Sequence, residues 1–168
     1  PNINPATGRT LALVGDCGPD ETDEAVAAAQ RAGRVWARQS PRSRGDILLA
    51  IAEDMEARIE HLARVITREN GKPLREATAE VLYAADFFRW YGEEGKRAYG
   101  ELVPANRPGT WHVVIRQPVG VVAVISPWNF PLAMLTRKLA PALAAGCTAV
   151  VKPAEQTPAS AIELFRIM

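Results

Sequence analysis

The most informative segment of the sequence is Val119-Gly120-Val121-Val122-Ala123-Val124-Ile125, a continuous apolar run typical of a β-strand that is buried on both faces. Residues 132–145 follow with the composition of a helix, and Gly146 provides its stop. Thr148-Ala149-Val150-Val151-Lys152 is a second run of the same kind. Strand, helix and strand fit within roughly thirty residues, which predicts a right-handed βαβ unit in a parallel sheet and an α/β fold.

Three helices are predicted before this unit, in residues 22–38, 42–70 and 73–97, and a further helix begins at Thr157. The second carries an apolar stripe along one side and charges along the other, as expected of an amphipathic helix against a core. An aromatic group in the third is interpreted as a packed helix face rather than as a ligand-binding cluster. Its members are Phe87, Phe88, Trp90 and Tyr91.

Residues 111–116 alternate between apolar and other side chains and follow a segment rich in proline and glycine. This pattern predicts an exposed ribbon with one apolar side. Because the open edge of such a strand needs a partner, we expect it to pair across a subunit boundary.

The composition excludes several classes of protein. The 168 residues are 48% hydrophobic and 23% charged, as in a globular domain. Twenty basic residues against nineteen acidic ones leave a net charge of +1, so no electrostatic footprint for nucleic acid is present. No apolar stretch approaches the roughly 20 residues of a membrane span. Two cysteines do not make a disulfide framework. We expect a reduced cytoplasmic protein without a signal peptide, and a chain trimmed at its start, because Pro1 stands in place of Met.

Two loops are the places to search for chemistry, because ligands of open parallel sheets bind beyond the carboxyl ends of the strands. Asn129 lies in the first loop between two prolines that stiffen it. Its side-chain amide could stabilise an oxyanion, although capping of the following helix is the more frequent role. In the second loop, Lys152 and Glu155 could bind a ribose or form only a surface ion pair.

The histidines and cysteines do not indicate a further functional site. The two histidines have no Cys/His cluster beside them, so no metal site is expected, and no glycine-rich phosphate loop is present. Cys147, at the start of a predicted strand, is expected to be a small buried residue and not a nucleophile. Cys17 lies in a loop and is expected to be exposed.

Several motifs resemble the NAD(P)-dependent aldehyde dehydrogenase superfamily. They are Ser126-Pro127-Trp128-Asn129-Phe130-Pro131, Ala140-Pro141-Ala142-Leu143-Ala144-Ala145-Gly146, Lys152-Pro153-Ala154-Glu155-Gln156-Thr157-Pro158, Asn4-Pro5-Ala6-Thr7-Gly8 and Glu69-Asn70-Gly71-Lys72-Pro73. Together they cover essentially the whole chain. Thr136-Arg137-Lys138 is similar to the succinate-semialdehyde dehydrogenase branch, with glutarate-semialdehyde enzymes close to it.

The resemblance implies a role for each candidate residue. Asn129 would be the side-chain half of the oxyanion hole for a cysteine thiohemiacetal. Arg137 would pair with the distal carboxylate of a semialdehyde, unless it is an ordinary cation on a helix surface. Lys152 and Glu155 would hold the adenosine ribose. The residues that would line the coenzyme cleft are Ile125, Ser126, Pro127 and Trp128.

The coenzyme implied is NAD, with NADP possible. A carboxylate at Glu155 would repel a 2′-phosphate, whereas Lys152 would act in the opposite direction. The substrate implied is a small semialdehyde, oxidised to its acid.

The resemblance also implies a domain organisation. Residues 1–99 and 119–168 would be the amino-terminal part of a coenzyme-binding domain in a Rossmann-like fold, and residues 100–118 an arm that builds a homo-oligomer. The family's cysteine nucleophile and glutamate base would lie beyond Met168 in a separate catalytic domain, so these residues alone would be inactive. Two alternatives are a non-catalytic binding or assembly module and an acylating dehydrogenase of the same superfamily.

Overall fold

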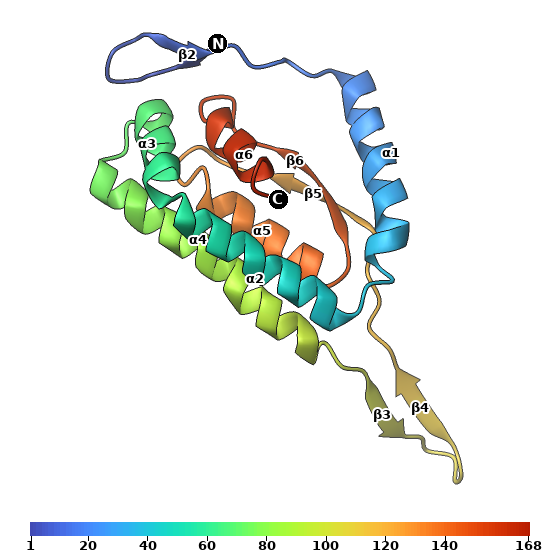
Figure 1. The fold of residues 1–168 in the computed structure, drawn as a ribbon. Helices are drawn as coiled ribbons and strands as arrows, with labels where there is room; N and C mark the ends of the chain where they lie inside the picture. Colours follow the sequence, from blue (N-terminus) through green and yellow to red (C-terminus); the bar gives the residue numbers. More distant parts are fainter.

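A computed structural model describes all 168 residues (Figure 1). The helices are α1 (Pro19–Trp36), α2 (Pro41–Ala57), α3 (Ile59–Asn70), α4 (Leu74–Glu94), α5 (Ala133–Ala144) and α6 (Pro158–Phe165), and a short 3-10 helix covers Gly95–Arg97. The strands form three pairs: β1 (Asn2–Ile3) with β2 (Thr10–Ala12), β3 (Glu101–Pro104) with β4 (Trp111–Val114), and β5 (Val121–Ile125) with β6 (Thr148–Lys152). The first two pairs are antiparallel and β5–β6 is parallel, which confirms the predicted strand–helix–strand unit.

The core lies between α5 and the helices α2, α3 and α4. Helix α5 packs against α4 and α2 on one side and against β5 and β6 on the other, while α1 contacts the sheet. Figure 1 shows this layering, with α2 and α4 in front of α5 and the strands behind it. Leu48, Phe88 and Leu135 are fully buried, so α2, α4 and α5 share a single core.

The β5–β6 pair has one buried and one partly covered face. Val122 and Val124 face the core under α5, whereas Val121 and Ala123 line a cavity next to α1. The expectation of a strand buried on both faces is therefore wrong, because Ile125, at the carboxyl end of β5, is 67% exposed. Alternation of side chains across a pleated strand requires this division into two faces.

The helix predicted for residues 42–70 is in fact two helices. The chain leaves helical geometry at Arg58, where φ is −108° and ψ is 20°. The break turns α3 away from the axis of α2, and α3 then packs against both α4 and α6 (Figure 1). No proline or glycine marks the break, so the tertiary contacts of α3 determine it. The predicted end of the helix at residue 70 is confirmed, because Gly71 follows it with φ of 80° in the left-handed region.

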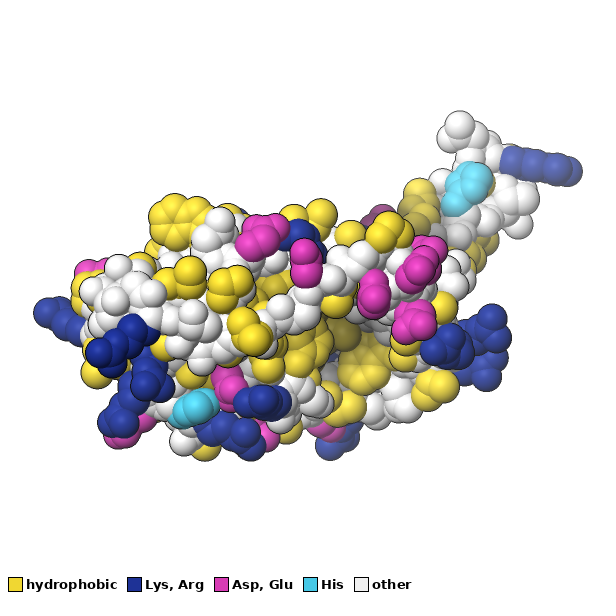
Figure 2. Space-filling model, turned by 90° about the horizontal axis from the view of Figure 1, so that it is seen from above, with side chains coloured by type: hydrophobic (Ala, Val, Ile, Leu, Met, Phe, Trp, Pro, Cys, Tyr) yellow, Lys and Arg dark blue, Asp and Glu magenta, His cyan; other side chains and the backbone are white.

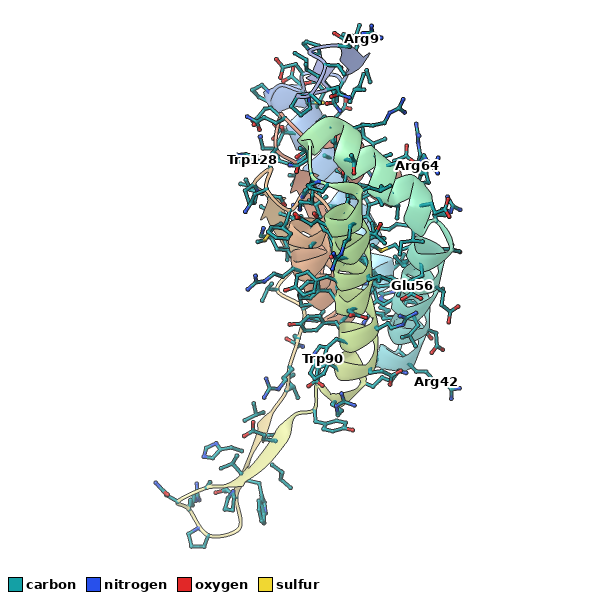
Figure 3. The ribbon with its side chains drawn as sticks, turned by 90° about the vertical axis from the view of Figure 1, so that its left-hand side faces the viewer. Arg9, Arg42, Glu56, Arg64, Trp90 and Trp128 are labelled. Atoms are coloured by element: carbon teal, nitrogen blue, oxygen red, sulfur yellow. The ribbon has the colours of Figure 1, made fainter.

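The aromatic residues of α4 divide between two faces. Phe88 is fully buried, but Trp90, two residues further, is 67% exposed, so the expected packing is wrong for Trp90. Figure 3 shows Trp90 near the end of α4 from which the β3–β4 hairpin leaves the body. A step of two residues turns about 200° around a helix and brings the side chain to the opposite side.

The β3–β4 hairpin projects from the body of the molecule (Figure 1), and every residue of both strands is exposed. One edge of β4 is paired within the chain, from Glu101 opposite Val114 to Pro104 opposite Trp111, a partner that the sequence analysis did not identify. The outer edge of β4 carries no strand. No helix of the chain combines the length and apolar character needed to cross a membrane.

The body also exposes apolar side chains. Figure 2 shows a broad band of them on the face seen from above, with basic residues mostly at its margins. Contiguous apolar surface of this kind is typical of regions that contact other protein surfaces.

Candidate functional site

The two loops singled out from the sequence begin side by side. Ile125 lies opposite Lys152 in the parallel register, and the Ser126 backbone N–H donates a 3.2 Å hydrogen bond to the Lys152 carbonyl oxygen. Because both strands end at the same edge, the loops at residues 126–131 and 153–157 rise from neighbouring points of the sheet. This is the edge at which parallel sheets bind ligands.

The first loop exposes its functional groups. Pro127, Trp128 and Asn129 are exposed, and Figure 3 shows Trp128 at the surface of the body. Ser126 is buried, and its hydroxyl oxygen has no hydrogen-bond partner. The Asn129 side chain makes no hydrogen bond within the chain, so it does not cap α5. The capping alternative for Asn129 is therefore wrong, and its amide remains available at the surface.

Glu80, a residue of α4 that sequence reasoning missed, caps α5 instead. Its carboxylate accepts hydrogen bonds from the backbone N–H groups of Leu132 and Ala133, at 2.9 and 3.2 Å. The first N–H groups of a helix have no partner within the helix, and a negative charge there is favourable. Glu80 also forms an ion pair with Lys72, which is equally absent from the predicted site.

Two residues contact the first loop from the junction of α3 and α4: Asn70, which ends α3, and Lys72, which lies in the turn before α4. The Lys72 ammonium donates to the carbonyl oxygen of Asn129 at 3.0 Å. The Asn70 side-chain amide donates to the carbonyl oxygen of Trp128 at 2.8 Å. The motif Glu69–Pro73, part of the resemblance noted above, was the only sequence signal for these residues, and it gave them no role.

The far end of α5 is also held by other helices. The Trp36 indole N–H donates to the Leu143 carbonyl at 3.0 Å, and Arg44 Nε donates to the Ala144 carbonyl at 3.1 Å. Burial lowers the pKa of Arg44, although a guanidinium stays charged at any physiological pH. Side chains from outside α5 thus satisfy backbone groups at both of its ends, which fixes the helix beneath the first loop.

Lys152, the last residue of β6, forms an ion pair with Glu155 of the second loop. Lys152 Nζ also donates to the Pro153 carbonyl at 3.2 Å. The hydrogen bond from Lys152 is the main reason that the pKa of Glu155 lies below its ordinary value of 4.5. Both side chains are exposed, so the pair presents a donor and an acceptor to solvent beside the first loop.

Arg137 and the two cysteines lie outside the two loops. Arg137 is exposed on α5, about one turn after the helix begins, and makes no hydrogen bond or ion pair within the chain. Cys147 is buried, as predicted, and immediately precedes β6, at the sheet edge opposite the two loops. Cys17 is exposed, as predicted, and precedes α1. Neither thiol reaches the first loop through any contact.

The candidate site is an open surface and not an enclosed cavity of this chain. A cavity of about 910 Å³ lies elsewhere, between α1 and the β5–β6 pair, and is lined by Val26, Val121 and Val150 among others. None of the candidate residues lines it. No three His, Cys, Asp or Glu side chains are grouped so that they could hold a metal ion.

Comparison with known proteins identifies a family that the whole chain matches. The family model described as "Aldehyde dehydrogenase family" matches residues 1–168. The chain is 50% identical over 164 residues to succinate-semialdehyde dehydrogenase [NADP(+)] of Escherichia coli, and 48% identical over 164 residues to glutarate-semialdehyde dehydrogenase of Pseudomonas putida. Each alignment covers 98% of this chain and 34% of the relative.

The fold of the chain also matches that of solved structures. Betaine aldehyde dehydrogenase from Staphylococcus aureus, in complex with NAD+, superposes with a TM-score of 0.95 at 34% identity, over 98% of this chain and 34% of that one. The chain thus spans about a third of the length of the relatives it matches.

Proposed function

The chain belongs to the aldehyde dehydrogenase family, and from that membership we propose that its protein oxidises succinate semialdehyde to succinate with a nicotinamide coenzyme. The observation that carries the proposal is the meeting of two loops at one sheet edge, with a free Asn129 amide in one and the Lys152–Glu155 pair in the other. Because the chain covers a third of its relatives, the activity is proposed for the whole protein.

Asn129 is proposed to stabilise the oxyanion that forms when a thiolate attacks the aldehyde. Its side chain is exposed and has no partner within the chain, and the loop around it is stiffened by Pro127 and Pro131. A preorganised amide donor at such a position is worth roughly 3–4 kcal/mol of transition-state stabilisation.

The residues present fit a dinucleotide. The exposed side chains of Ile125 and Trp128 offer apolar surface, 67% and 56% exposed, and Lys152 with Glu155 offers a donor and an acceptor to ribose hydroxyls. The cleft is proposed to be lined by Ile125, Ser126, Pro127 and Trp128. When bound, the nicotinamide coenzyme supplies the hydride acceptor.

We propose NAD as the preferred coenzyme, with NADP as the alternative. The ionised Glu155 carboxylate would repel a 2′-phosphate, and the lowered pKa keeps it ionised. Lys152 reduces this discrimination, because it neutralises much of that charge. One relative is named for NADP(+), and the solved relative contains NAD+.

The attacking cysteine is proposed to lie outside these 168 residues, since Cys147 is buried at the opposite sheet edge. Its thiolate forms a C–S bond to the aldehyde carbon, and Asn129 holds the resulting oxyanion. Loss of a hydride from this adduct would leave a thioester, and a bound nicotinamide coenzyme would supply the acceptor for that hydride. Water, activated by a general base also outside this chain, releases the acid and the thiol.

Arg137 is proposed to bind the distal carboxylate of the substrate. Its guanidinium is exposed and has no ion pair within the chain. It can therefore donate two hydrogen bonds to the carboxylate of a substrate in a bidentate contact. Glutarate semialdehyde, one methylene longer, is the alternative substrate, in keeping with the names of both relatives.

Residues 100–118 are proposed to form the oligomerisation arm of a homo-oligomer, and residues 1–99 and 119–168 to belong to the coenzyme-binding domain. The projecting hairpin, with exposed Trp111 and Val113, supports this division. We propose a cytoplasmic enzyme without nucleic-acid or membrane partners.

A second candidate function is a non-catalytic binding or assembly module. It is favoured by the position of the two cysteines, neither of which lies at the candidate site.

The test is an assay of the purified full-length protein with NAD and with NADP. Succinate semialdehyde, glutarate semialdehyde and butanal are offered in turn, with and without coenzyme A. We expect coenzyme reduction with a semialdehyde, release of the free acid, and no dependence on coenzyme A. Dependence on coenzyme A would indicate the acylating alternative, and no turnover of either semialdehyde would refute the proposed function.

A further inference from the structure

We propose that Asn70, Lys72 and Glu80 are positioning residues for Asn129, setting the direction in which its side-chain amide points. The inference rests on the oxyanion role proposed above and extends it to three residues that contact the loop of Asn129 or the start of α5. We call them the bracket.

The bracket fixes both peptide groups that flank the Cα atom of Asn129. Asn70 holds the carbonyl oxygen of Trp128, which belongs to the peptide group before Asn129. Lys72 holds the carbonyl oxygen of Asn129 itself, which belongs to the peptide group after it. Because a peptide group is planar, fixing both planes fixes φ and ψ between them and therefore the direction of the Cα–Cβ bond.

Lys72 also contacts the residue after Asn129. Its ammonium lies 4.0 Å from the ring centroid of Phe130, within the range of a cation–π contact. The Lys72 side chain thus contacts two successive residues of the loop: the carbonyl oxygen of Asn129 and the ring face of Phe130. The loop cannot rotate about this point without breaking one of the two contacts.

Within the bracket, Glu80 connects Lys72 to α5. One carboxylate oxygen pairs with Lys72, and the other accepts from Leu132 and Ala133. The Lys72 side chain is 10% exposed and the Glu80 side chain 1% exposed. A buried ion pair contributes little net stability, because desolvation offsets the attraction. Its geometric effect is specific, however, because it aligns the loop with the first turn of the following helix.

The turn that carries two of these residues is itself fixed. Gly71, between Asn70 and Lys72, ends α3 with φ of 80°, and a Cβ there would lie 3.0 Å from the Pro5 ring. The sharp reversal directs the two donors toward successive carbonyl oxygens of one loop. A residue other than glycine would be strained in this conformation.

The experiment is a double-mutant cycle in the full-length protein, with succinate semialdehyde as substrate and the oligomer intact. Lys72→Met removes the ammonium and retains an apolar stem, and Asn70→Ala removes the second donor. Arg89→Met is the matched control, because it removes another ion pair of α4, to Glu56 of α2, away from the loop. Each variant is made in the native sequence and in the Asn129→Ala background.

The bracket variants should lower kcat by about 10- to 100-fold while the KM for aldehyde and coenzyme changes much less, because misplacement of a catalytic group acts on the transition state. With Asn129→Ala already present, the same substitutions should lower kcat less than about threefold, because the group that they position is gone. Arg89→Met should leave kcat unchanged in both backgrounds.

Two kinetic outcomes separate this inference from the proposed function. Equal losses of kcat in both backgrounds would show that the bracket does not act through Asn129, and would overturn the inference alone. An Asn129→Ala variant with unchanged kcat would refute the oxyanion role, and the positioning role with it.

A second measurement needs no turnover. Amide hydrogen exchange of the segment 126–135 should accelerate in Lys72→Met and Asn70→Ala and stay unchanged in Arg89→Met. If Lys72→Met fails to fold, Asn70→Ala carries the test, since its side chain is only half-buried. Unchanged exchange in Asn70→Ala would contradict the bracket.

Discussion

Asn2 and Glu69 lie 67 residues apart in the sequence, and the Asn2 side-chain amide donates a 2.9 Å hydrogen bond to the buried Glu69 carboxylate. The same carboxylate accepts from the backbone N–H groups of Ala159 and Ser160 and from the Ser160 hydroxyl, at 2.8, 2.8 and 2.5 Å. Glu69 therefore joins the first strand, the end of α3 and the start of α6.

Removal of the Glu69 carboxylate should destabilise the protein strongly. Glu69→Ala leaves several buried donors without a partner, each costing about 1–3 kcal/mol. We expect a loss of about 3 kcal/mol or more in the free energy of unfolding, measured by urea denaturation. Glu60→Ala on the same helix is the control, because its pair with Arg64 is exposed and should contribute less than about 1 kcal/mol. Similar losses in the two variants would contradict the role assigned to Glu69.

The crossing of α2 and α4 should not tolerate a methyl group. A Cβ at Gly45 would lie 2.4 Å from the backbone oxygen of Gly92, so Gly45→Ala must push the helices apart. We expect a lower melting temperature and about 1–3 kcal/mol of destabilisation from overpacking. Gly15→Ala, with no atom within 4 Å of its Cβ, is the matched control and should be neutral or slightly stabilising. An unchanged melting temperature in Gly45→Ala would contradict this close packing.

Arg137 should discriminate between charged and neutral aldehydes. Arg137→Met should lower kcat/KM for succinate semialdehyde by about 30-fold or more, since a charge-assisted pair to the carboxylate is lost. The value for butanal, which has no carboxylate, should change less than about threefold, and this neutral substrate serves as the internal control. Equal losses for the two aldehydes would assign Arg137 to the fold instead.

Glu155 should set the coenzyme ratio without a pH dependence in the working range. Because hydrogen bonding to Lys152 lowers its pKa, the carboxyl remains ionised as pH falls from 9 to 6 and would be neutralised only below its ordinary value of 4.5. The ratio of kcat/KM for NAD and NADP should stay constant from about pH 7.5 to 9, where the 2′-phosphate, whose second pKa is about 6, is also fully ionised. Glu155→Gln should shift the ratio toward NADP by about tenfold. A ratio that titrates between about pH 7.5 and 9 would assign the discrimination to another group of the protein.

The projecting hairpin should determine the oligomeric state. Trp111→Glu places a charge on the apolar side of β4 and should convert the assembly to a smaller species in light scattering. His112→Ser, on the opposite side of the same strand, should leave the mass unchanged. An unaltered mass for Trp111→Glu would place the subunit interface elsewhere.

Local patterns were sufficient to predict most elements of the fold. The apolar run before Ser126, the glycine stops at Gly71 and Gly146, and the second strand ending at Lys152 all have signals within a few residues. The break at Arg58 has none, because the angle between α2 and α3 is set by packing against α4 and α6. Burial of the two strand faces was misjudged for a similar reason, since an apolar run does not reveal what covers it.

The candidate site was only half predictable. Asn129, Lys152 and Glu155 follow from their positions after parallel strands. The charged residues behind them, Glu80 and Lys72, look like ordinary solvent-facing side chains of a helix and a turn. Their burial depends on partners about fifty or more residues away, and no local pattern reports such contacts.

The anchoring of α5 by Arg44 has a consequence for synthesis on the ribosome. Ala144 is made 100 residues after its donor, so at roughly 5–20 residues per second the arginine waits about 5–20 s for the carbonyl it will bind. Until then the apolar faces of α2 and α4 lack the helix that covers them in the folded chain. We expect chaperones to bind a nascent chain whose apolar helix faces are still uncovered. Slower translation between residues 95 and 144 should prolong this binding.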